Sequence, residues 1–357
     1  MNRRTFAKSL VAGLVLGSAT RSFGQILPEH PLYASWEVWK AAYLGVDGRV
    51  VDGPQGSASH SESQGFGLCL AAFFGDRGAF NRIYGWTEAN LRIRDDMLLA
   101  WRWLPDADVH VPDRNNASDG DLFYAWGLML GSAAFGDTLQ MDLARRIVTD
   151  LVAACIVPSP DGQGLVMLPA AEGFREGETV TINPSYYMPR AMRELSEATG
   201  DMTLRQCHDD GLALMERLAW NGTIPDWVAI DIGGPLPTPK LSNATGYEAM
   251  RVPLYLLWSR LGSHPAVLRA ADAYRGDLDA DPFGPSPTII DPASLSVTER
   301  SPDPGYGAIR ALVTCAVAGR GPAPFPPFTA AQPYYPGTLH LMALLAQYEG
   351  YPQCYPL

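Results

Sequence analysis

Apolar side chains recur at intervals of three or four residues along almost the whole chain, which is the spacing of one face of an α-helix. Such stretches predict about eleven helices after residue 24, and therefore an all-α fold. The main interruption is the turn-rich segment 162–182, in which the sequences LVML and ETVTI predict short strands. Clear examples of the helical spacing are Trp36, Trp39 and Tyr43, then Leu143, Ile147, Leu151 and Cys155, and later Leu254, Leu257 and Leu261.

Long connections rich in proline, glycine, aspartate and asparagine join the predicted helices. Two of them run from Trp103 to Gly120 and from Ile232 to Gly246. Loops longer than about 12–15 residues inside a compact domain usually carry function, so we expect the chemistry on these connections. Because no polar linker or composition shift divides the chain, we expect residues 25–357 to form one domain of paired helices. The periodicity leaves open whether the pairs form a bundle, a solenoid or a closed toroid.

The first 24 residues have the composition of an export signal peptide. Basic residues precede the apolar run Leu10–Leu16, and the small residues that end at Gly24 suit a signal peptidase. The run is shorter than the about 20 residues that a membrane span needs, so we expect no span. The pair Arg3–Arg4 followed by TFAK resembles a twin-arginine signal, although an ordinary secretory signal shares this layout. We therefore predict an exported protein, periplasmic or secreted, that loses residues 1–24.

Acidic residues outnumber basic ones by 38 to 27, which gives a formal net charge of −11. Nucleic acids and anionic membrane surfaces need a clustered positive field, and the chain has no run of lysine or arginine after its N-terminus. We therefore expect no nucleic-acid partner, and instead a neutral or cationic one.

The cysteines and histidines do not form a recognisable site. No CxxC or HExxH motif occurs, and the six histidines are scattered, so we expect no metal and no cofactor. An odd and dispersed set of cysteines is not a disulfide framework, and Cys69, Cys155 and Cys315, which lie inside apolar helical runs, are expected to be buried free thiols. The cysteines are Cys69, Cys155, Cys207, Cys315 and Cys354.

Three acidic clusters interrupt otherwise apolar sequence. Helix capping by a serine or by one aspartate, and a surface ion pair at i, i+3, are the ordinary explanations for such residues. A helix cap uses only one of two neighbouring aspartates, however, so the second aspartate needs another role. The aromatic residues around the ion pair indicate that the pair lies in a recess and not on the open surface. The clusters are HSESQGFG at 60–67 with Glu62, NNASDGDLFYAWGLMLG at 115–131 with Asp119 and Asp121, and GYEAMRVPLYLLW at 246–258 with Glu248 and Arg251.

Carboxylates in aromatic-rich loops, with no nucleophile motif and no metal motif, are what glycoside hydrolysis requires. One carboxylic acid protonates the leaving oxygen, and a second carboxylate acts on water or on carbon. The flat faces of tryptophan and tyrosine can bind sugar rings, and the chain has nine Trp and fifteen Tyr. The clusters therefore indicate chemistry on a sugar polymer.

Several motifs resemble those of glycoside hydrolase family 8, in the order in which the family has them. HSESQGFG is similar to the acid motif of the family, usually SEGQGYG, and ASDGD at 117–121 resembles the family signature. NPSYY at 183–187, YEAMRVPLY at 247–255 and the opening segment WEVWKAAYLGVDGRVVD at 36–52 also match. The resemblance covers essentially all of the chain after the predicted signal. It is nearest to the endoglucanases of bacterial cellulose synthesis complexes.

The resemblance implies an (α/α)6 toroid, in which two concentric rings of six helices carry loops that form an open cleft for a β-1,4-glucan chain. It also implies hydrolysis with net inversion at the anomeric carbon, and a cellulose synthase complex as a possible partner. The implied catalytic residues are Glu62 as general acid, Asp119 as the residue that holds the sugar at the cleavage point, and Glu248 at the general-base position.

Further residues have supporting roles by the same resemblance. Tyr186 would help to place the water, Arg251 would orient the base, and Asp121 belongs to the same signature. Three aromatic residues are candidates for contact with sugar rings: Trp101, Tyr247 and Tyr335.

General physical chemistry constrains these roles. A helix N-terminus stabilises an ionised carboxylate by roughly 0.3–1 kcal/mol, whereas a general acid has to keep its proton. Glu62 therefore needs burial or a neighbouring negative charge, and Asp119 is the expected neighbour. An inverting pair also has to leave room for a water molecule, with its carboxyl groups roughly 6.5–9.5 Å apart.

The chain departs from the family pattern at a few positions. The cellulase branch ordinarily has Asp where this chain has Glu248, and a shift on the order of 1 Å at a catalytic group can cost about 100-fold in rate. Two hypotheses therefore stand: an endo-β-1,4-glucanase, or a weakly active or inactive glucan-binding accessory of a cellulose secretion system. A xylanase or chitosanase of the same family is a third. Smaller departures are Ser63, Phe66 and Tyr124.

Overall fold

Eleven α-helices lie in the residues that the computed structural model describes, which are 25–321 and 323–355. This number agrees with the sequence prediction. The predicted signal, residues 1–24, lies outside the described residues. The helices are α1 (Pro31–Tyr43), α2 (Ser61–Phe73), α3 (Arg77–Asn90), α4 (Ser118–Phe135), α5 (Thr138–Cys155), α6 (Pro189–Thr199), α7 (Met202–Ala219), α8 (Arg251–Trp258), α9 (Pro265–Ala280), α10 (Pro304–Ala318) and α11 (Tyr334–Gly350).

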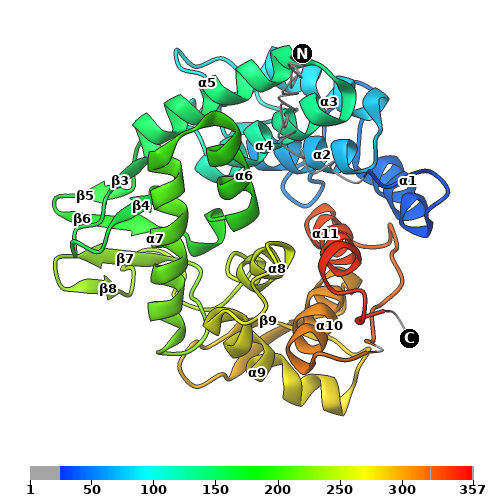
Figure 1. The fold of residues 1–357 in the computed structure, drawn as a ribbon, viewed down its shortest axis with the longest axis vertical. Coiled ribbons are helices and arrows are strands. Elements are labelled where there is room, and N and C mark those ends of the chain that lie inside the picture. The colour runs from blue at the N-terminus through cyan, green and yellow to red at the C-terminus, as the bar shows by residue number, and fades with distance from the viewer. Residues whose placement is uncertain (1–24, 322, 356–357) are drawn as a thin grey trace, which may run out of the picture.

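The helices alternate along the chain between two environments. α2, α4, α8, α10 and α11 are buried along most of their length, whereas α1, α3, α5, α7 and α9 bury one face and expose the other. α6 packs against both α4 and α8. In Figure 1, α6 and the first group surround the centre of the molecule, and the second group lies outside them. This is the (α/α)6 arrangement of an inner and an outer ring, so the predicted fold class is confirmed, with six inner and five outer helices in the described chain.

Neighbouring inner helices run parallel, and their N-terminal ends meet on one side of the barrel. Where α2 and α4 begin, a β-carbon at Gly120 would overlap Ser61 Oγ and the backbone nitrogen of Glu62. Where α10 and α11 begin, a β-carbon at Gly305 would overlap the carbonyl of Pro336. Glycine at these two positions lets the helix ends approach closely, which brings the side chains of their first turns together.

The two rings begin their helices differently. The outer helices α3, α5 and α7 follow Asp76, Asp137 and Asp201, and each of these carboxylates accepts a hydrogen bond from a first-turn backbone N–H. The inner helices α4, α6, α8, α10 and α11 have no side-chain cap of this kind. α2 begins after His60, so neither adjacent serine is the cap. Polar residues at the starts of the inner helices are therefore available for other contacts.

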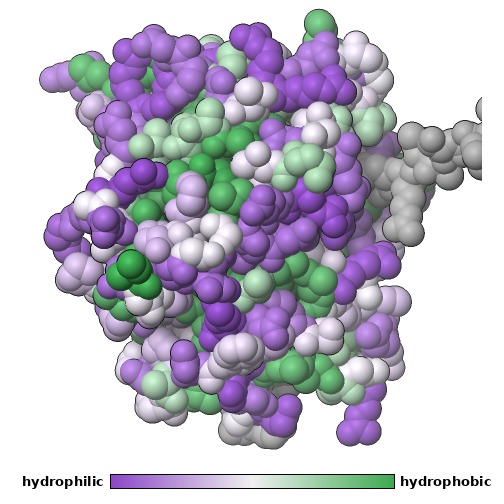
Figure 2. All heavy atoms as spheres, turned by 60° about the vertical axis from the view of Figure 1, so that its left-hand side comes forward, coloured by the Kyte–Doolittle hydropathy of each residue, from purple (hydrophilic) through white to green (hydrophobic). Residues whose placement is uncertain are grey.

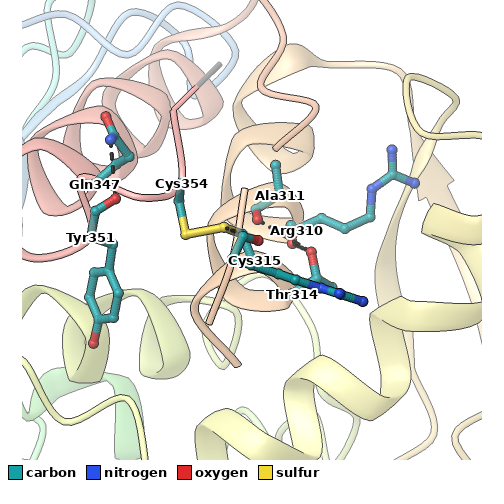
Figure 3. Close-up of a disulfide and its surroundings, with 8 residues drawn as sticks. Arg310, Ala311, Thr314, Cys315, Gln347, Tyr351 and Cys354 are labelled. Atoms are coloured by element: carbon teal, nitrogen blue, oxygen red, sulfur yellow. Dashed lines mark hydrogen bonds between the residues drawn. A yellow bond between two sulfur atoms is a disulfide. The ribbon is translucent and has the colours of Figure 1, made fainter. Parts of the chain in front are cut away.

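The outer ring has no sixth helix within the described chain. Between α10 and α11 the chain runs through a proline-rich segment that ends at Pro333 and has no helix in its described residues. Cys315, near the end of α10, forms a disulfide with Cys354 beyond α11 (Figure 3). The bond corrects the prediction that Cys315 is a free thiol and that the cysteines form no disulfide. The partners are 39 residues apart, so no local motif could indicate the pairing. Cys69 and Cys155 are buried and free, as predicted.

The β excursion consists of short antiparallel strands, of which β5, β6, β7 and β8 form one sheet in that order. β4 and β6 coincide with the two predicted strands, whereas the other strands were not predicted. On the side of the molecule that carries this sheet, hydrophobic and hydrophilic surface is intermixed (Figure 2). The strands are β1 (Ser59–His60), β2 (Arg102–Trp103), β3 (Ile156–Pro158), β4 (Leu165–Met167), β5 (Arg175–Glu176), β6 (Thr179–Ile182), β7 (Val228–Asp231), β8 (Gly234–Leu236), β9 (Ser286–Ile290) and β10 (Val297–Ser301).

Within the described parts of the chain, no helix is both long enough and apolar enough to cross a membrane. The same residues contain no group of three or more His, Cys, Asp or Glu side chains arranged to hold a metal ion.

Candidate active site

A cavity of about 460 Å³ opens where the N-terminal ends of the inner helices meet. Each of α2, α4, α8, α10 and α11 contributes a residue from its first turns, and the short 3-10 turn Pro184–Tyr186 contributes one just before α6. The long connections predicted to carry the chemistry lead into this cavity at both Ala117 and Tyr247. The lining comprises Asp52, Pro54, Gln55, His60, Ser61, Glu62, Trp101, Ala117, Asp119, Tyr186, Tyr247, Glu248, Arg251, Tyr306, Pro333, Tyr335 and Pro336.

Glu62 and Asp119 come together because α2 and α4 are pressed against each other at their starts. Glu62 lies in the first turn of α2 and Asp119 in the first turn of α4, and Gly120 allows the close approach. The side chain of Glu62 is 21% exposed, whereas that of Asp119 is 3% exposed. The structure therefore places the two carboxyls side by side, as predicted, and Glu62 is the more exposed of the two in the cavity.

Arg251 joins all three predicted catalytic carboxylates. Its Nη1 donates to Glu62 and lies 3.6 Å from Asp119 Oδ2, while its Nη2 donates to Glu248 and, at 2.6 Å, to Ser185 Oγ. The guanidinium is buried, so these contacts act with little solvent screening. The planar fork of arginine holds each partner in a fixed direction, which keeps Glu62 and Glu248 on different nitrogens of one rigid group.

The charges of this cluster are coupled. Burial and the neighbouring charge of Glu62 raise the pKa of Asp119 well above its ordinary value, against the opposing effect of Arg251. Burial opposes the charged form of Arg251, but the carboxylates of Glu248 and Glu62 outweigh it and raise its pKa, so the guanidinium stays charged. Burial, with Asp119 and Glu248 adding to it, also raises the pKa of Tyr186. The cluster therefore combines a fixed cation with a carboxyl group, that of Asp119, which releases its proton less readily than an exposed aspartate does.

Glu248 is the most exposed of the three carboxylates, with 35% of its side chain accessible. Its Oε2 accepts hydrogen bonds from Asn183 Nδ2 at 3.0 Å and from Arg251, and Ser185 Oγ lies 3.5 Å away. Within the described residues, no hydrogen bond goes to its Oε1. One carboxylate oxygen is therefore fixed by protein donors and the other is free for a ligand or water.

The three aromatic residues predicted to contact sugar all line the cavity. Trp101 stacks on His60 with ring centroids 6.1 Å apart, and its Nε1 donates to Asp113 at 2.8 Å. The hydroxyl of Tyr335 donates to the backbone carbonyl of Tyr247, and the hydroxyl of Tyr247 donates to Glu299. These contacts fix the rings and leave part of their surfaces toward the cavity.

Asp121, by contrast, does not line the cavity. Its carboxylate is fully buried and accepts hydrogen bonds from the Leu99 backbone N–H at 2.8 Å and from Asn116 at 2.9 Å. Burial raises its pKa to about 7 in spite of these hydrogen bonds. Asp121 therefore supports the segments that carry Trp101 and Asp119, and does not itself face a ligand.

Sequence reasoning missed several residues of the cavity wall. Asp52 is 3% exposed, and its carboxylate accepts a hydrogen bond from Gln55 at 3.0 Å. Tyr306, from the start of α10, packs against Tyr247 with ring centroids 5.8 Å apart. Asp52 ends the opening segment that resembles the family, which was the available signal, whereas nothing in the sequence around Tyr306 connects it with the acidic clusters.

Comparisons with known protein sequences identify the family to which a chain with this cavity belongs. The sequence model of the glycosyl hydrolases family 8 matches residues 19–349. A probable endoglucanase of Novacetimonas hansenii is 32% identical over 350 residues, which cover 95% of this chain and 97% of that protein. An endoglucanase of Cellulomonas uda is 31% identical and covers 80% of this chain and 79% of its own length.

Solved structures show the same fold. The endoglucanase Cel10 of Klebsiella pneumoniae, described as a family 8 glycosyl hydrolase, superposes with a TM-score of 0.79 at 30% identity, over 88% of this chain and 99% of its own. The endo-beta-1,4-glucanase CMCax of Acetobacter xylinum gives a TM-score of 0.78 at 29% identity, over 89% of this chain and 98% of its own. Sequence, fold and cavity thus agree, and the chain belongs to family 8 of the glycosyl hydrolases.

Proposed function

We propose that the protein is an endo-β-1,4-glucanase that hydrolyses cellulose-type glucan with inversion. The observation that carries the proposal is the arrangement of Glu62 and Glu248 in one cavity, on different nitrogens of Arg251. An inverting pair has to stand far enough apart for a water molecule, roughly 6.5–9.5 Å, and a rigid guanidinium between two carboxylates favours such a separation. The related proteins are named endoglucanases, one of them an endo-beta-1,4-glucanase, which supports a β-1,4-glucan as the substrate.

Glu62 is the proposed general acid. Because the pKa of Asp119 is raised, the Glu62–Asp119 pair keeps a proton at a higher pH than an exposed aspartate would. Of the two, only Glu62 has appreciable exposure to the cavity. It is therefore the member that can pass the proton to the glycosidic oxygen, while Asp119 keeps the shared proton available and lies where a sugar hydroxyl can bind.

Glu248 is the proposed general base. Its Oε2 is held by Asn183 and Arg251, so its free Oε1 is the atom that would accept a proton from the attacking water. Tyr186 lines the same cavity, with its ring centroid 5.7 Å from the guanidinium carbon of Arg251, and the raised pKa of its hydroxyl keeps it a hydrogen-bond donor in the neutral range. The hydroxyl is thus suited to orient that water toward the anomeric carbon.

Export is the proposed location, because two independent features support it. The N-terminal residues have the composition of a signal peptide. The bond between Cys315 and Cys354 is of a kind that forms and persists in oxidising compartments. Both features favour the periplasm or the exterior.

The proposed roles are tested by Glu62→Gln and Glu248→Gln, each of which removes an ionisable group and keeps the shape. We expect kcat on carboxymethyl cellulose to fall by about 10²–10⁴-fold in each variant, which is the usual worth of a general acid or base. The matched control is Glu194→Gln, because Glu194 also pairs with an arginine but lies outside the cavity. NMR of the first products should show the inverted anomer. A variant that retains wild-type turnover would remove its residue from the proposed role.

A further inference from the structure

The turn that carries Glu248 is held by a buried carboxylate that takes no part in the chemistry proposed above. Asp226 is 6% exposed and comes just before β7, on a different segment of the chain. Its Oδ1 accepts hydrogen bonds from the backbone N–H groups of Gly246 at 2.9 Å, Glu248 at 3.2 Å and Ala249 at 2.8 Å. A single oxygen therefore binds three N–H groups of the turn, including that of Glu248 itself.

Other contacts show that the turn is fitted around this carboxylate. The second oxygen, Oδ2, accepts a hydrogen bond from Ser242 Oγ at 2.8 Å. The backbone N–H of Asp226 donates to the carbonyl of Ala244 at 2.7 Å. A β-carbon at Gly246 would lie only 2.5 Å from Oδ2, so glycine is needed there for the turn to close on the carboxylate. The segment 242–249 thus wraps around Asp226 on several sides.

The turn ends directly at the start of α8, where Arg251 stands. α8 has no side-chain cap, and its first backbone N–H groups, those of Arg251 and Val252, donate to the carbonyls of Glu248 and Ala249 in this turn. The position of the Glu248 backbone is therefore set by Asp226, and the position of its carboxylate by Asn183 and Arg251. The position of the free Oε1 therefore depends on both the backbone contacts with Asp226 and the side-chain contacts with Asn183 and Arg251.

We infer that Asp226 is a positioning residue for catalysis, which holds the backbone of Glu248 so that its free carboxylate oxygen stays at the place of the attacking water. The inference rests on the proposed function, since it gives Glu248 the role of base. It requires only the oxygen that accepts the three N–H groups, and does not require the charge of Asp226. An asparagine could supply the same oxygen.

The experiment compares Asp226→Ala with Asp226→Asn in the full chain, with kcat and KM measured on carboxymethyl cellulose. Loss of the three hydrogen bonds frees the turn, and a misplacement on the order of 1 Å costs about 100-fold in rate, so we expect kcat to fall by about 10–100-fold in Asp226→Ala. Asp226→Asn keeps the accepting oxygen and should stay within about 3-fold of wild type. An asparagine variant as impaired as the alanine variant would overturn the inference, as would an alanine variant with wild-type kcat.

A double-mutant cycle separates action through Glu248 from a general loss of structure. In the Glu248→Gln background there is no base left to misplace, so adding Asp226→Ala should lower the residual kcat by less than 2-fold. If instead the double variant loses kcat by the product of the two single-variant factors, the inference is contradicted. The matched control is Asp210→Ala, because Asp210 also binds a backbone N–H, that of Leu165 at the start of β4, at 2.7 Å, but outside the cavity. It should change thermal stability and leave kcat unaltered.

The two proposals fail in distinguishable ways. If Glu248→Gln keeps wild-type turnover, the assignment of the base is wrong whatever Asp226→Ala does. If Glu248→Gln is inactive while Asp226→Ala is fully active, the function stands and the role of Asp226 alone is wrong.

Discussion

At the scale of single residues, most departures from the family motifs have local partners away from the carboxylates. Ser63 accepts a hydrogen bond within the first turn of α2, and Phe66 packs edge-on against Phe123 with ring centroids 4.6 Å apart. The hydroxyl of Tyr124 donates to Glu88 on α3 at 2.7 Å. These substitutions are absorbed by packing, which leaves Glu248 as the departure that faces the cavity.

Glu248→Asp tests whether that departure is a defect or is fitted to this chain. The longer side chain reaches Asn183 and Arg251, so its shortening by one methylene should withdraw the carboxylate from both donors. We expect kcat to fall by about 10–100-fold, with little change in KM, in assays on carboxymethyl cellulose. A rise in kcat would instead favour the hypothesis of a weakly active glucan-binding accessory, whose base is misplaced in the natural sequence.

At the scale of elements, the contact between the starts of α2 and α4 decides the geometry of the acid pair. Both helices are buried along almost their whole length and have glycines where they touch, at Gly65 and Gly120. A side chain at either position would meet the backbone of the facing helix. The distance between Glu62 and Asp119 is therefore a property of helix packing, and not only of their own rotamers.

Gly120→Ala should accordingly impair catalysis strongly, although it adds only one methyl group. The added methyl overlaps Ser61 and the backbone of Glu62, so the helix starts have to separate. We expect a fall in kcat of about 100-fold and a loss of roughly 1–3 kcal/mol in the free energy of unfolding. Kinetics and thermal denaturation measure both effects.

The control is Gly85→Ala on the outer helix α3, where a β-carbon would meet no atom within 4 Å. That change should stabilise the protein by about 0.5–1 kcal/mol and leave kcat unaltered. Equal behaviour of the two variants would show that the contact between α2 and α4 does not control the acid pair.

The sequence predicts the helices better than the long-range contacts between segments of the chain. Helical spacing of apolar residues is a local signal, so it indicated the helices correctly, and the motifs indicated most cavity residues. Asp226 carries no such signal, because its role depends on backbone N–H groups of a segment some twenty residues away. The pairing of Cys315 with Cys354 escaped prediction for a similar reason, since it depends on how two helices end in space.

At the scale of the whole molecule, the cavity and the disulfide lie at opposite ends of the barrel. Tyr306 at the start of α10 lines the cavity, and Cys315 stands near the other end of the same helix. The disulfide fixes the C-terminal segment beside the stretch of chain that replaces a sixth outer helix. It therefore stabilises the barrel where its outer ring is incomplete, at a distance from the proposed catalytic residues.

Removal of the disulfide should lower the free energy of unfolding and leave the catalytic rate nearly unchanged. In Cys315→Ser/Cys354→Ser we expect a loss of about 2–4 kcal/mol, or a fall in Tm of roughly 3–8 °C, because the unfolded chain gains freedom. The kcat at 25 °C should stay within 2-fold of wild type. Reductant should lower the Tm of the wild type and leave that of the variant unchanged. A large loss of kcat at an unchanged Tm would contradict this separation.

The parallel inner helices have a consequence for how such a barrel can change over evolution. Because every inner helix starts at the cavity, every connection from an outer helix into the inner ring reaches the same rim, and each contributes its own piece of wall. Insertions or replacements in one connection can alter the length and chemistry of the groove while the helices behind it keep their packing. Changes in the connections can therefore reshape the cavity without disturbing the barrel, whereas a change at a helix start, such as Gly120→Ala, affects the packing and the cavity together.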